Sequence, residues 1–316
     1  MDTPKTLSEA IQSFANPDNA IRYFSAKRWP DGVACPYCEA DEPMFLSTRK
    51  IWKCRKCRKQ FSVKVGTIFE DSAIPLSKWL TAMWLIANCK NGVSSYEIAR
   101  DLGITQKSAW FMLQRIRQAL QGKKGGKIGG HIEVDETFIG GKARNMHLRK
   151  RRERIQGRGV TGKAVVIGML QRGGQVRTAI IDDRDKETLH GFVRENVRRG
   201  ASVYTDELLS YYGLDSDYTH QVINHAEEYV RGQVHTNGME NFWSLLKRGL
   251  SGTYVSVEPF HLFRYIDEQA FRYNNRKDMT DADRFALACS LAAGKRLAWN
   301  ELTGKAGAAL SAQPAF

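Results

Sequence analysis

The sequence predicts a chain of several domains that mixes α-helices and β-strands. Three observations support this: two Cys-x-x-Cys pairs within the first 60 residues, two helical patterns joined by a short glycine turn, and strand-like runs followed by helical patterns from residue 131. A glycine-lysine run separates the second feature from the third. We therefore expect five segments, at residues 1–70, 71–121, 122–130, 131–290 and 291–316.

The charge of the chain points to a polyanionic partner. Its 316 residues include 48 Lys+Arg and 34 Asp+Glu, a formal net charge of +14. Such an excess most often favours nucleic acid, through release of condensed counterions. The sequence has no apolar run of about 18 residues and does not begin like a signal peptide, so we expect no membrane span and a cytoplasmic location.

The first segment, residues 1–70, is predicted to be a zinc ribbon preceded by a helix. Two pairs of cysteines with 15 residues between them can form a tetrahedral four-thiolate site. The expected ligands of this structural Zn²⁺ are Cys35, Cys38, Cys54 and Cys57. The alternative is four unrelated buried cysteines. Seven basic residues between Arg49 and Lys59 suggest contact with phosphates, although they could also form a solvated face on a protein-binding ribbon.

Residues 94–120 predict a helix-turn-helix within the segment 71–121. Ser94 and Glu97 match a capping box, Gly103 can end the first helix, and Thr105 can cap the second. The second helix would then be a recognition helix that contacts DNA. Its expected DNA-binding residues are Gln106, Lys107, Ser108, Trp110 and Arg115. The alternative is a helical hairpin that serves only for packing.

The segment 131–290 opens with strand-like runs and carries acids at two of them. Residues 131–141 alternate apolar and polar side chains, which places Asp135 on the polar side of a first strand. Two further apolar runs predict an antiparallel meander, and a helical pattern follows. Residues 201–207 then read as a short strand that ends at Asp206, the usual place for a site in an α/β sheet.

The stretch "HTNGMENFWSLLKR", residues 235–248, predicts an amphipathic helix with a third acid. One apolar stripe should face a core, whereas Glu240 and Lys247 share a line on another face. Acids on a first strand, at the end of a later strand and on a following helix can converge on a pair of divalent metal ions. Carboxylates suit Mg²⁺ or Mn²⁺. Each acid taken alone could equally be a helix cap or a solvated residue.

The sequence resembles the bacterial insertion-sequence DDE transposases that have an N-terminal zinc ribbon and a ribonuclease-H-like catalytic domain, the ISXO-like branch. The stretches that carry the resemblance, between residue 35 and about residue 277, are "CPYC…CRKC", "VDETFIGG", "VYTDE", "HTNGMENFWSLLKRGLSGTY" and "RYIDEQAFRYNNR". The resemblance implies an α/β ribonuclease-H-like core with a mixed sheet and flanking helices. It also implies that Asp135, Asp206 and Glu240 are the metal-binding triad, with Lys247 beside them. Because some related enzymes use Asn in place of the third acid, Asn237 is a possible ligand; alternatively it caps the helix.

The function implied is metal-dependent cleavage at the ends of an insertion sequence and strand transfer into target DNA. The expected partners are double-stranded DNA, as element terminal repeats and target, and further copies of the chain in a homodimer or higher oligomer. Such an enzyme would work at the bacterial nucleoid. Two alternatives stay open: a domesticated sequence-specific DNA-binding protein with an inactive core, and a ribonuclease-H-like nuclease.

Overall fold

The structure of the protein, a computed structural model, describes residues 2–122, 125–140, 163–223 and 235–304. These residues form two compact units. The first comprises residues 2–122 together with 275–304, and the second comprises the described part of 125–274. No helix in these parts of the chain is long and apolar enough to cross a membrane.

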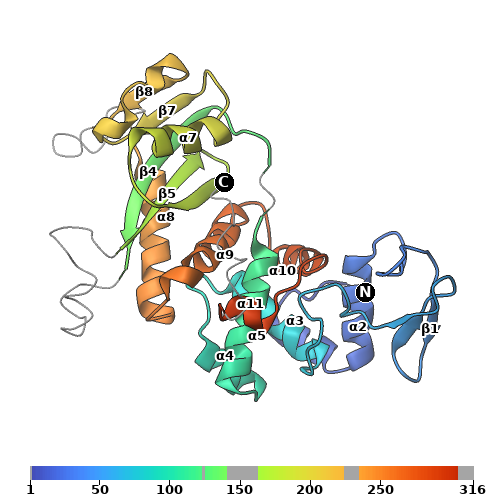
Figure 1. Ribbon diagram of the computed structural model, residues 1–316. Helices are drawn as coiled ribbons and strands as arrows, with labels where there is room; N and C mark the ends of the chain where they lie inside the picture. The colour runs from blue at the N-terminus through green and yellow to red at the C-terminus, as the bar shows by residue number, and fades with distance from the viewer. Residues whose placement is uncertain (1, 123–124, 141–162, 224–234, 305–316) are drawn as a thin grey trace. The chain divides into compact units, whose positions relative to one another are not determined.

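The first unit consists of helices and a small antiparallel sheet (Figure 1). Its elements are α1 (Leu7–Phe14), α2 (Pro17–Arg28), β1 (Met44–Leu46), β2 (Ile51–Lys53), β3 (Gln60–Phe61), α3 (Leu76–Asn88), α4 (Ser95–Leu102), α5 (Gln106–Leu120), α10 (Asp281–Ser290) and α11 (Trp299–Leu302). The strands pair in the order β1-β2-β3, and because Met44 pairs with Lys53, the two Cys-x-x-Cys turns lie at the same end of this short ribbon.

Residues 275–304 are built into this first unit. Helix α10 packs against α2 and α3, and the ring of Phe285 stacks on Tyr23 with centroids 5.5 Å apart. The Lys295 ammonium donates to the carbonyl oxygens of Gln118, Ala119 and Gln121 at 2.9–3.0 Å. A cation at this position satisfies carbonyls that the end of α5 leaves without partners. We expected residues 131–290 to form one domain, whereas the chain from residue 275 packs with the N-terminal helices.

Helices α4 and α5 begin and end where their capping residues predict. Ser94 and Glu97 make both bonds of a capping box, and Gly103 ends α4 in the left-handed conformation with φ 57°. The Thr105 side chain accepts from the backbone N–H of Ser108 and so caps α5. The apolar residues at helical spacing in α5 are buried: Ala109, Met112, Leu113 and Ile116. The local features of the predicted helix pair are therefore present.

The second unit is a mixed sheet with helices on both faces. Its elements are β4 (His131–Ile139), β5 (Ala164–Gln171), β6 (Val176–Ile181), α7 (Lys186–Asn196), β7 (Ser202–Thr205), the 3-10 turns η2 (Leu209–Tyr211) and η3 (Leu214–Ser216), β8 (Thr219–Val222), α8 (Asn237–Arg248), the π-helical turn η4 (Gly249–Thr253), the 3-10 turn η5 (Pro259–His261) and α9 (Leu262–Asn274). Among the described residues, five strands pair in the order β6-β5-β4-β7-β8.

The sheet combines an antiparallel half and a parallel half around β4. Strands β4, β5 and β6 form the antiparallel meander that the apolar runs predict. Helix α7 then carries the chain across the sheet, so β7 pairs in parallel with β4, and β8 in parallel with β7. This crossover brings the end of β7 beside the middle of β4, although 71 residues separate the paired positions Glu133 and Tyr204.

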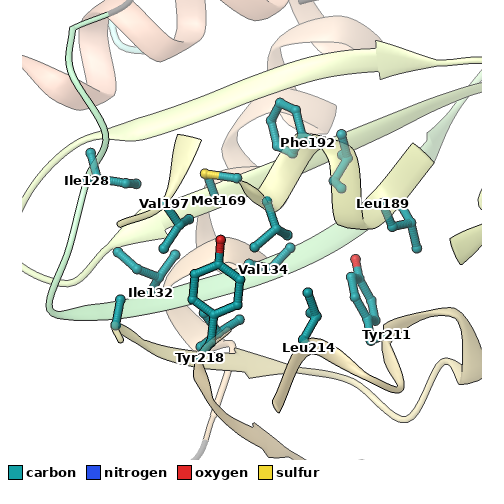
Figure 2. Packing of buried hydrophobic residues seen from close by; sticks show 14 residues of the cluster. Ile128, Ile132, Val134, Met169, Leu189, Phe192, Val197, Tyr211, Leu214 and Tyr218 are labelled. Carbon is teal, nitrogen blue, oxygen red and sulfur yellow. The ribbon is translucent and has the colours of Figure 1, made fainter. Parts of the chain in front are cut away.

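Both faces of the sheet are buried, by different helices. On one face, Ile132 and Val134 of β4 pack with residues of α7 and of the turns η2 and η3 (Figure 2). On the other face, residues of β5 and β6 pack under Met239, Phe242 and Trp243 of α8 and under α9. The polar side of β4 therefore faces a helix rather than water, a difference from the half-exposed strand that its alternation predicts.

Two glycines allow α8 to approach the sheet closely. A Cβ atom on Gly168 of β5 would lie 2.4 Å from Cε of Met239 and 2.7 Å from the ring of Trp243. A Cβ atom on Gly238 of α8 would lie 2.4 Å from Cδ2 of Leu170. Glycine inside a strand often marks such an approach. The two contacts come from opposite sides of one interface. The helix therefore lies nearer the strands than it could if either glycine carried a side chain.

We expect Gly168→Ala to lower the free energy of unfolding of the second unit by about 1–3 kcal/mol, since the added methyl group overpacks a dense interface. The matched control is Gly191→Ala in α7, where an added Cβ meets no atom within 4 Å. This control should raise stability by about 0.5–1 kcal/mol, because alanine favours a helix. Urea denaturation of both variants checks the difference, and equal effects would contradict the close approach of α8.

Candidate functional site

The first two predicted acids lie side by side on adjacent strands. The parallel pairing of β4 with β7 joins Glu133 to Tyr204. The same register continued by two residues places Asp135 opposite Asp206, which directly follows β7. Parallel neighbours in a sheet are about 4.8 Å apart. The structure thus brings together two carboxylates that are 71 positions apart in the chain.

The surroundings of Asp135 disfavour its charged form. Burial, together with the negative charges of Glu136 and Asp206, raises the pKa of Asp135 to about 7, against the lowering effect of two hydrogen bonds. These bonds come from the backbone N–H of Glu136 at 2.9 Å and from Nε1 of Trp243 at 3.0 Å. A divalent cation between Asp135 and Asp206 would offset their repulsion, so the two carboxylates fit a metal ion.

A further buried acid, Glu136, lies on the opposite face of β4 beside this pair. Its carboxylate accepts from the Tyr211 hydroxyl at 2.7 Å and lies 3.5 Å from Nη1 of Arg184. Burial raises the pKa of Glu136, and the charge of Asp206 adds to that effect. Sequence reasoning missed Glu136 as part of the site. The available signal was an acid at a position that strand alternation assigns to the apolar face.

Helix α8 carries the third predicted acid next to a residue that contacts Asp135. Its apolar stripe is buried as expected, and Trp243 of that stripe donates to Oδ2 of Asp135 at 3.0 Å. Glu240 precedes Trp243 by three residues and therefore neighbours it on the helix surface. The Glu240 side chain is exposed and accepts from the Thr236 hydroxyl at 3.5 Å. Lys247 is exposed two turns further along the same flank.

The three carboxylates do not form a tight cluster in the structure. Among the described residues, only four cysteines form a group of three or more potential metal ligands whose atoms lie within 4.8 Å of one another. Asn237 is the first residue of α8 and is exposed, while Thr236 occupies the N-cap position. The structure therefore pairs Asp135 with Asp206 and places Glu240 and Asn237 on the first turn of the neighbouring helix.

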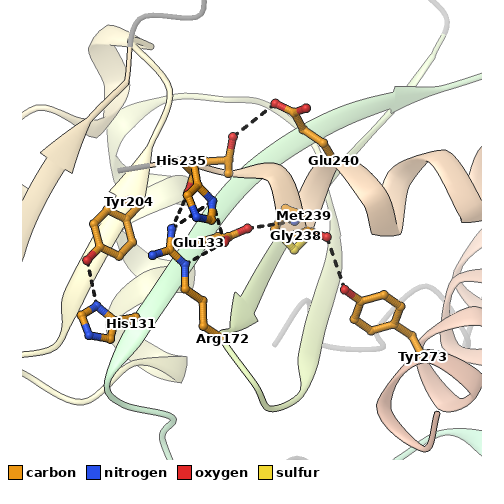
Figure 3. A network of polar contacts seen from close by, with 10 residues as sticks. His131, Glu133, Arg172, Tyr204, His235, Gly238, Met239, Glu240 and Tyr273 are labelled. Carbon is orange, nitrogen blue, oxygen red and sulfur yellow. Dashed lines mark hydrogen bonds and ion pairs between the residues drawn. The ribbon is translucent and has the colours of Figure 1, made fainter. Parts of the chain in front are cut away.

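A network of buried polar groups lies beneath that first turn (Figure 3). Glu133, two residues before Asp135, is 1% exposed and bonds both Nε of Arg172 and the backbone N–H of Met239. The sequence does not reveal this network, because its members come from β4, from the turn after β5 and from α8. A polar residue inside an otherwise buried strand was the one available signal.

The motif "YNN" at the end of α9 fastens that helix to the sheet and to α8. The side-chain amide of Asn274 accepts from the backbone N–H of Val176 at 2.6 Å and donates to its carbonyl at 3.0 Å. The Tyr273 hydroxyl donates to the carbonyl of Gly238 at 3.4 Å. These residues act through backbone groups, which helix periodicity cannot predict.

The four N-terminal cysteines form the metal-binding geometry that their spacing predicts. Their ligand atoms lie within 4.8 Å of one another, with Sγ atoms 3.7 Å apart for Cys35 and Cys57 and 3.6 Å apart for Cys38 and Cys54. Zn–S bonds of about 2.3 Å in a tetrahedron require sulfur atoms about 3.8 Å apart. The backbone N–H of Cys57 donates to Cys54 and lowers the pKa of the Cys54 thiol to about 6. The cluster therefore fits a structural zinc ion.

The two cysteine turns share one backbone design. Cys35 N–H donates to the carbonyl of Ala40, and Cys54 N–H donates to the carbonyl of Lys59, each at 2.9 Å. The residue after each second cysteine, Glu39 or Arg58, has a positive φ near 60°. Each turn thus presents its two thiols on the same side, the arrangement of a zinc knuckle.

The residues predicted to contact DNA on α5 divide into surface and interior groups. Lys107 is exposed, and its ammonium lies 4.8 Å from the ring centroid of Trp299. Gln106 and Ser108 are half-buried, and Trp110 packs edge-on against Trp299. Arg115 is 4% exposed and donates to the carbonyl of Glu70 at 2.6 Å, so in this structure its side chain serves packing.

Comparison with known proteins defines the class of the chain. Residues 127–274 match the family model of the ISXO2-like transposase domain, and residues 16–60 match the model of the transposase zinc-ribbon domain. The first match covers the described sheet with α7, α8 and α9, and the second covers both cysteine pairs up to residue 60. The two matches therefore place the chain among transposase-family proteins with an N-terminal zinc-ribbon domain.

Two relatives agree with these matches. A protein described as uncharacterized in transposable element ISH50 of Halobacterium salinarum is 28% identical over 254 residues, which cover 76% of this chain and 85% of the relative. An uncharacterized transposase-like protein of Haemophilus influenzae is 33% identical over 102 residues, 32% of this chain and 82% of the relative. The chain belongs to the family of ISXO2-like transposases.

We expect the wild-type protein to hold about one zinc ion per chain, and Cys54→Ser to lose it, because three thiolates cannot complete the tetrahedral site. Elemental analysis of the purified proteins measures the zinc content. Cys89→Ser is the control, since Cys89 lies outside the cluster and should keep the zinc. Full zinc retention by Cys54→Ser would contradict the assignment.

The raised pKa of Asp135 predicts an unusual dependence of stability on pH without added divalent metal. Between pH 4 and 7 the unfolded chain releases this proton while the folded protein keeps it, so stability falls as pH rises through that window. Asp135→Asn removes the effect and should raise the free energy of unfolding by roughly 2–4 kcal/mol at pH 8, with little change at pH 4. Denaturation at both pH values tests this, and an equal gain at both would refute it.

Proposed function

We propose that the protein is a DNA transposase that cleaves the ends of its insertion sequence and transfers them to target DNA with the help of divalent metal ions. The observation that carries the proposal is the pairing of Asp135 with Asp206 beside a helix that bears Glu240. The strand order and the crossover through α7 support a ribonuclease-H-like core. The family of the chain supports the same reaction.

The proposed metal ligands are Asp135, Asp206 and Glu240, with Mg²⁺ or Mn²⁺ as the metal. These side chains would hold the metal ions, which would supply Lewis-acid stabilisation to an in-line phosphoryl displacement. Trp243 donates to Oδ2 of Asp135 and the backbone N–H of Glu136 donates to Oδ1, so the carboxylate is held in place while each oxygen keeps a second lone pair for coordination. Glu240 reaches the site by rotation of its own exposed side chain. Lys247, on the same flank of α8, binds a phosphate of the DNA.

DNA binding is proposed for the first unit. Helices α4 and α5 form the helix-turn-helix, and Gln106, Lys107 and Ser108 at the start of α5 contact the DNA. Arg115 supports this helix from beneath through its bond to Glu70. The basic residues of the zinc ribbon contact phosphates, in keeping with the net charge of +14.

The partners follow from the reaction. The enzyme binds double-stranded DNA both as the terminal repeats of its element and as the target. Joining two ends in one complex calls for a homodimer or a higher oligomer on DNA. The proposed reaction takes place at the bacterial nucleoid.

Two other functions make different predictions in one assay. A domesticated DNA-binding protein would bind a specific DNA without cutting it, and a ribonuclease-H-like nuclease would cut without joining. A labelled element end, incubated with target DNA and Mg²⁺, separates the three cases. Only a transposase yields a product in which the label is covalently joined to the target.

We expect Asp135→Ala, Asp206→Ala and Glu240→Ala each to reduce cleavage by at least about 1,000-fold, since each removes a metal ligand, while binding to the element end persists. Gel-shift and cleavage assays on the same DNA measure the two properties. Asn237→Ala is the control for the third ligand. If Asn237→Ala is inactive and Glu240→Ala cuts normally, Asn237 replaces Glu240 in the triad.

A further inference from the structure

A buried carboxylate that the proposed reaction does not use lies directly under the start of α8. The Glu133 side chain is 2% exposed. One of its oxygens lies 2.8 Å from Nε of Arg172, and the other accepts from the backbone N–H of Met239 at 3.0 Å (Figure 3). Met239 belongs to the first turn of α8, where backbone N–H groups lack partners within the helix. The Glu133 carboxylate therefore anchors this turn from the strand.

Arg172 connects Glu133 to two other parts of the unit. Its Nη2 atom donates to the carbonyl of His235, just before α8, at 2.8 Å. Its guanidinium stacks 4.3 Å from the ring centroid of Tyr204 on β7. The Tyr204 hydroxyl in turn bonds Nδ1 of His131 at 2.8 Å. One half-buried cation thus joins the turn after β5, the strand β7 and the segment just before α8.

The contacts between β4 and α8 follow a matched spacing. Glu133 and Asp135 project from one face of β4, about 6.7 Å apart along the strand. They bond Met239 and Trp243, which lie about 6 Å apart along the helix. Two acids of one strand therefore hold two successive turns of one helix. This two-point attachment fixes both the height and the rotation of α8 against β4.

The attachment of α8 to β4 affects the position of the proposed metal ligand Glu240. Glu240 lies between Met239 and Trp243 in sequence, and it follows the anchored N–H group by one residue. A rotation of α8 about its axis would change the position of Glu240 relative to Asp135, because Glu240 neighbours both attachment points on the helix surface. Loss of the Glu133 bond removes one of these two attachments to β4 and so weakens the resistance to that rotation.

We propose that Glu133 and Arg172 are positioning residues, which set the rotation of α8 and so place Glu240 beside the pair formed by Asp135 and Asp206. The proposal rests on the proposed function, since it concerns the same metal site. Groups that orient metal ligands in this way affect affinity for the metal by about 10–100-fold when they are removed. The charged pair is buried, so it also contributes to folding, and the test must separate the two effects.

The test compares the full-length wild type with Glu133→Gln in two measurements. Calorimetry measures the binding of Mn²⁺ to the folded protein, and a cleavage assay measures the rate at which each protein cuts DNA. Glutamine keeps the size of the side chain, but without the negative charge it loses the ion pair with Arg172 and accepts only a weaker bond from Met239. We expect Mn²⁺ affinity to fall roughly 10-fold and the cleavage rate to fall by up to about 100-fold. Binding to the element end should not change.

Glu268→Gln is the matched control. Glu268 is also fully buried and forms an ion pair with an arginine, Arg272, but both lie in α9. Its replacement should lower thermal stability without changing the Mn²⁺ affinity of the folded protein. An equal loss of affinity in both variants would show a general effect of destabilisation and would overturn the positioning role.

Arg172→Lys is the second test of the proposal if Glu133→Gln does not fold. Lysine keeps the charge next to Glu133 but cannot also reach the carbonyl of His235 and stack on Tyr204 in the same way. We expect a several-fold loss of Mn²⁺ affinity, and unchanged affinity overturns the proposal. Asp135→Ala, measured in the same assays, distinguishes failure of the positioning role from failure of the proposed function. If it is inactive while Glu133→Gln resembles wild type, only the positioning role fails; if it cuts DNA normally, the proposed function fails.

Discussion

The arrangement of the second unit depends on one constraint: strand β4 is buried on both of its faces. Ile132 and Val134 fill the core under α7, so the alternate residues Glu133 and Asp135 must face α8. Those residues are acids, and a buried acid needs a partner. Glu133 bonds an arginine and a helix N–H group, while Asp135 accepts from an indole N–H and from the backbone N–H of Glu136. Structural and proposed catalytic acids thus alternate with core residues on a single strand.

Local patterns were sufficient to predict most of the elements. Period-two alternation identified β4, and capping residues identified both ends of α4 and the start of α5. Long-range packing was not predictable in the same way. Strand β8 contains only four residues with no apolar alternation, and α10 returns to pack with helices about 200 positions earlier in the chain. Both depend on partners that are distant in sequence.

In the candidate site, too, local patterns were predictable and long-range contacts were not. Asp135 and Asp206 could be predicted because each stands at a recognisable place in a strand, and the parallel register then brings them together. Tyr211 and Arg172, the partners of Glu136 and Glu133, could not be predicted, because these contacts join residues that are distant in sequence. Arg115 illustrates the reverse case. Helical spacing placed it on a DNA-binding helix, whereas the fold buries its guanidinium against Glu70.

The amide of Asn274 has a consequence for the solubility of the unit. In the described sheet β6 is an outer strand, and such a strand offers unpaired backbone groups to any other extended chain. At Val176 both of these groups are already bonded, one as donor and one as acceptor, to a single side chain from α9. A side-chain amide here imitates the next strand of the sheet. The end of α9 thereby blocks the start of this edge against intermolecular strand pairing and aggregation.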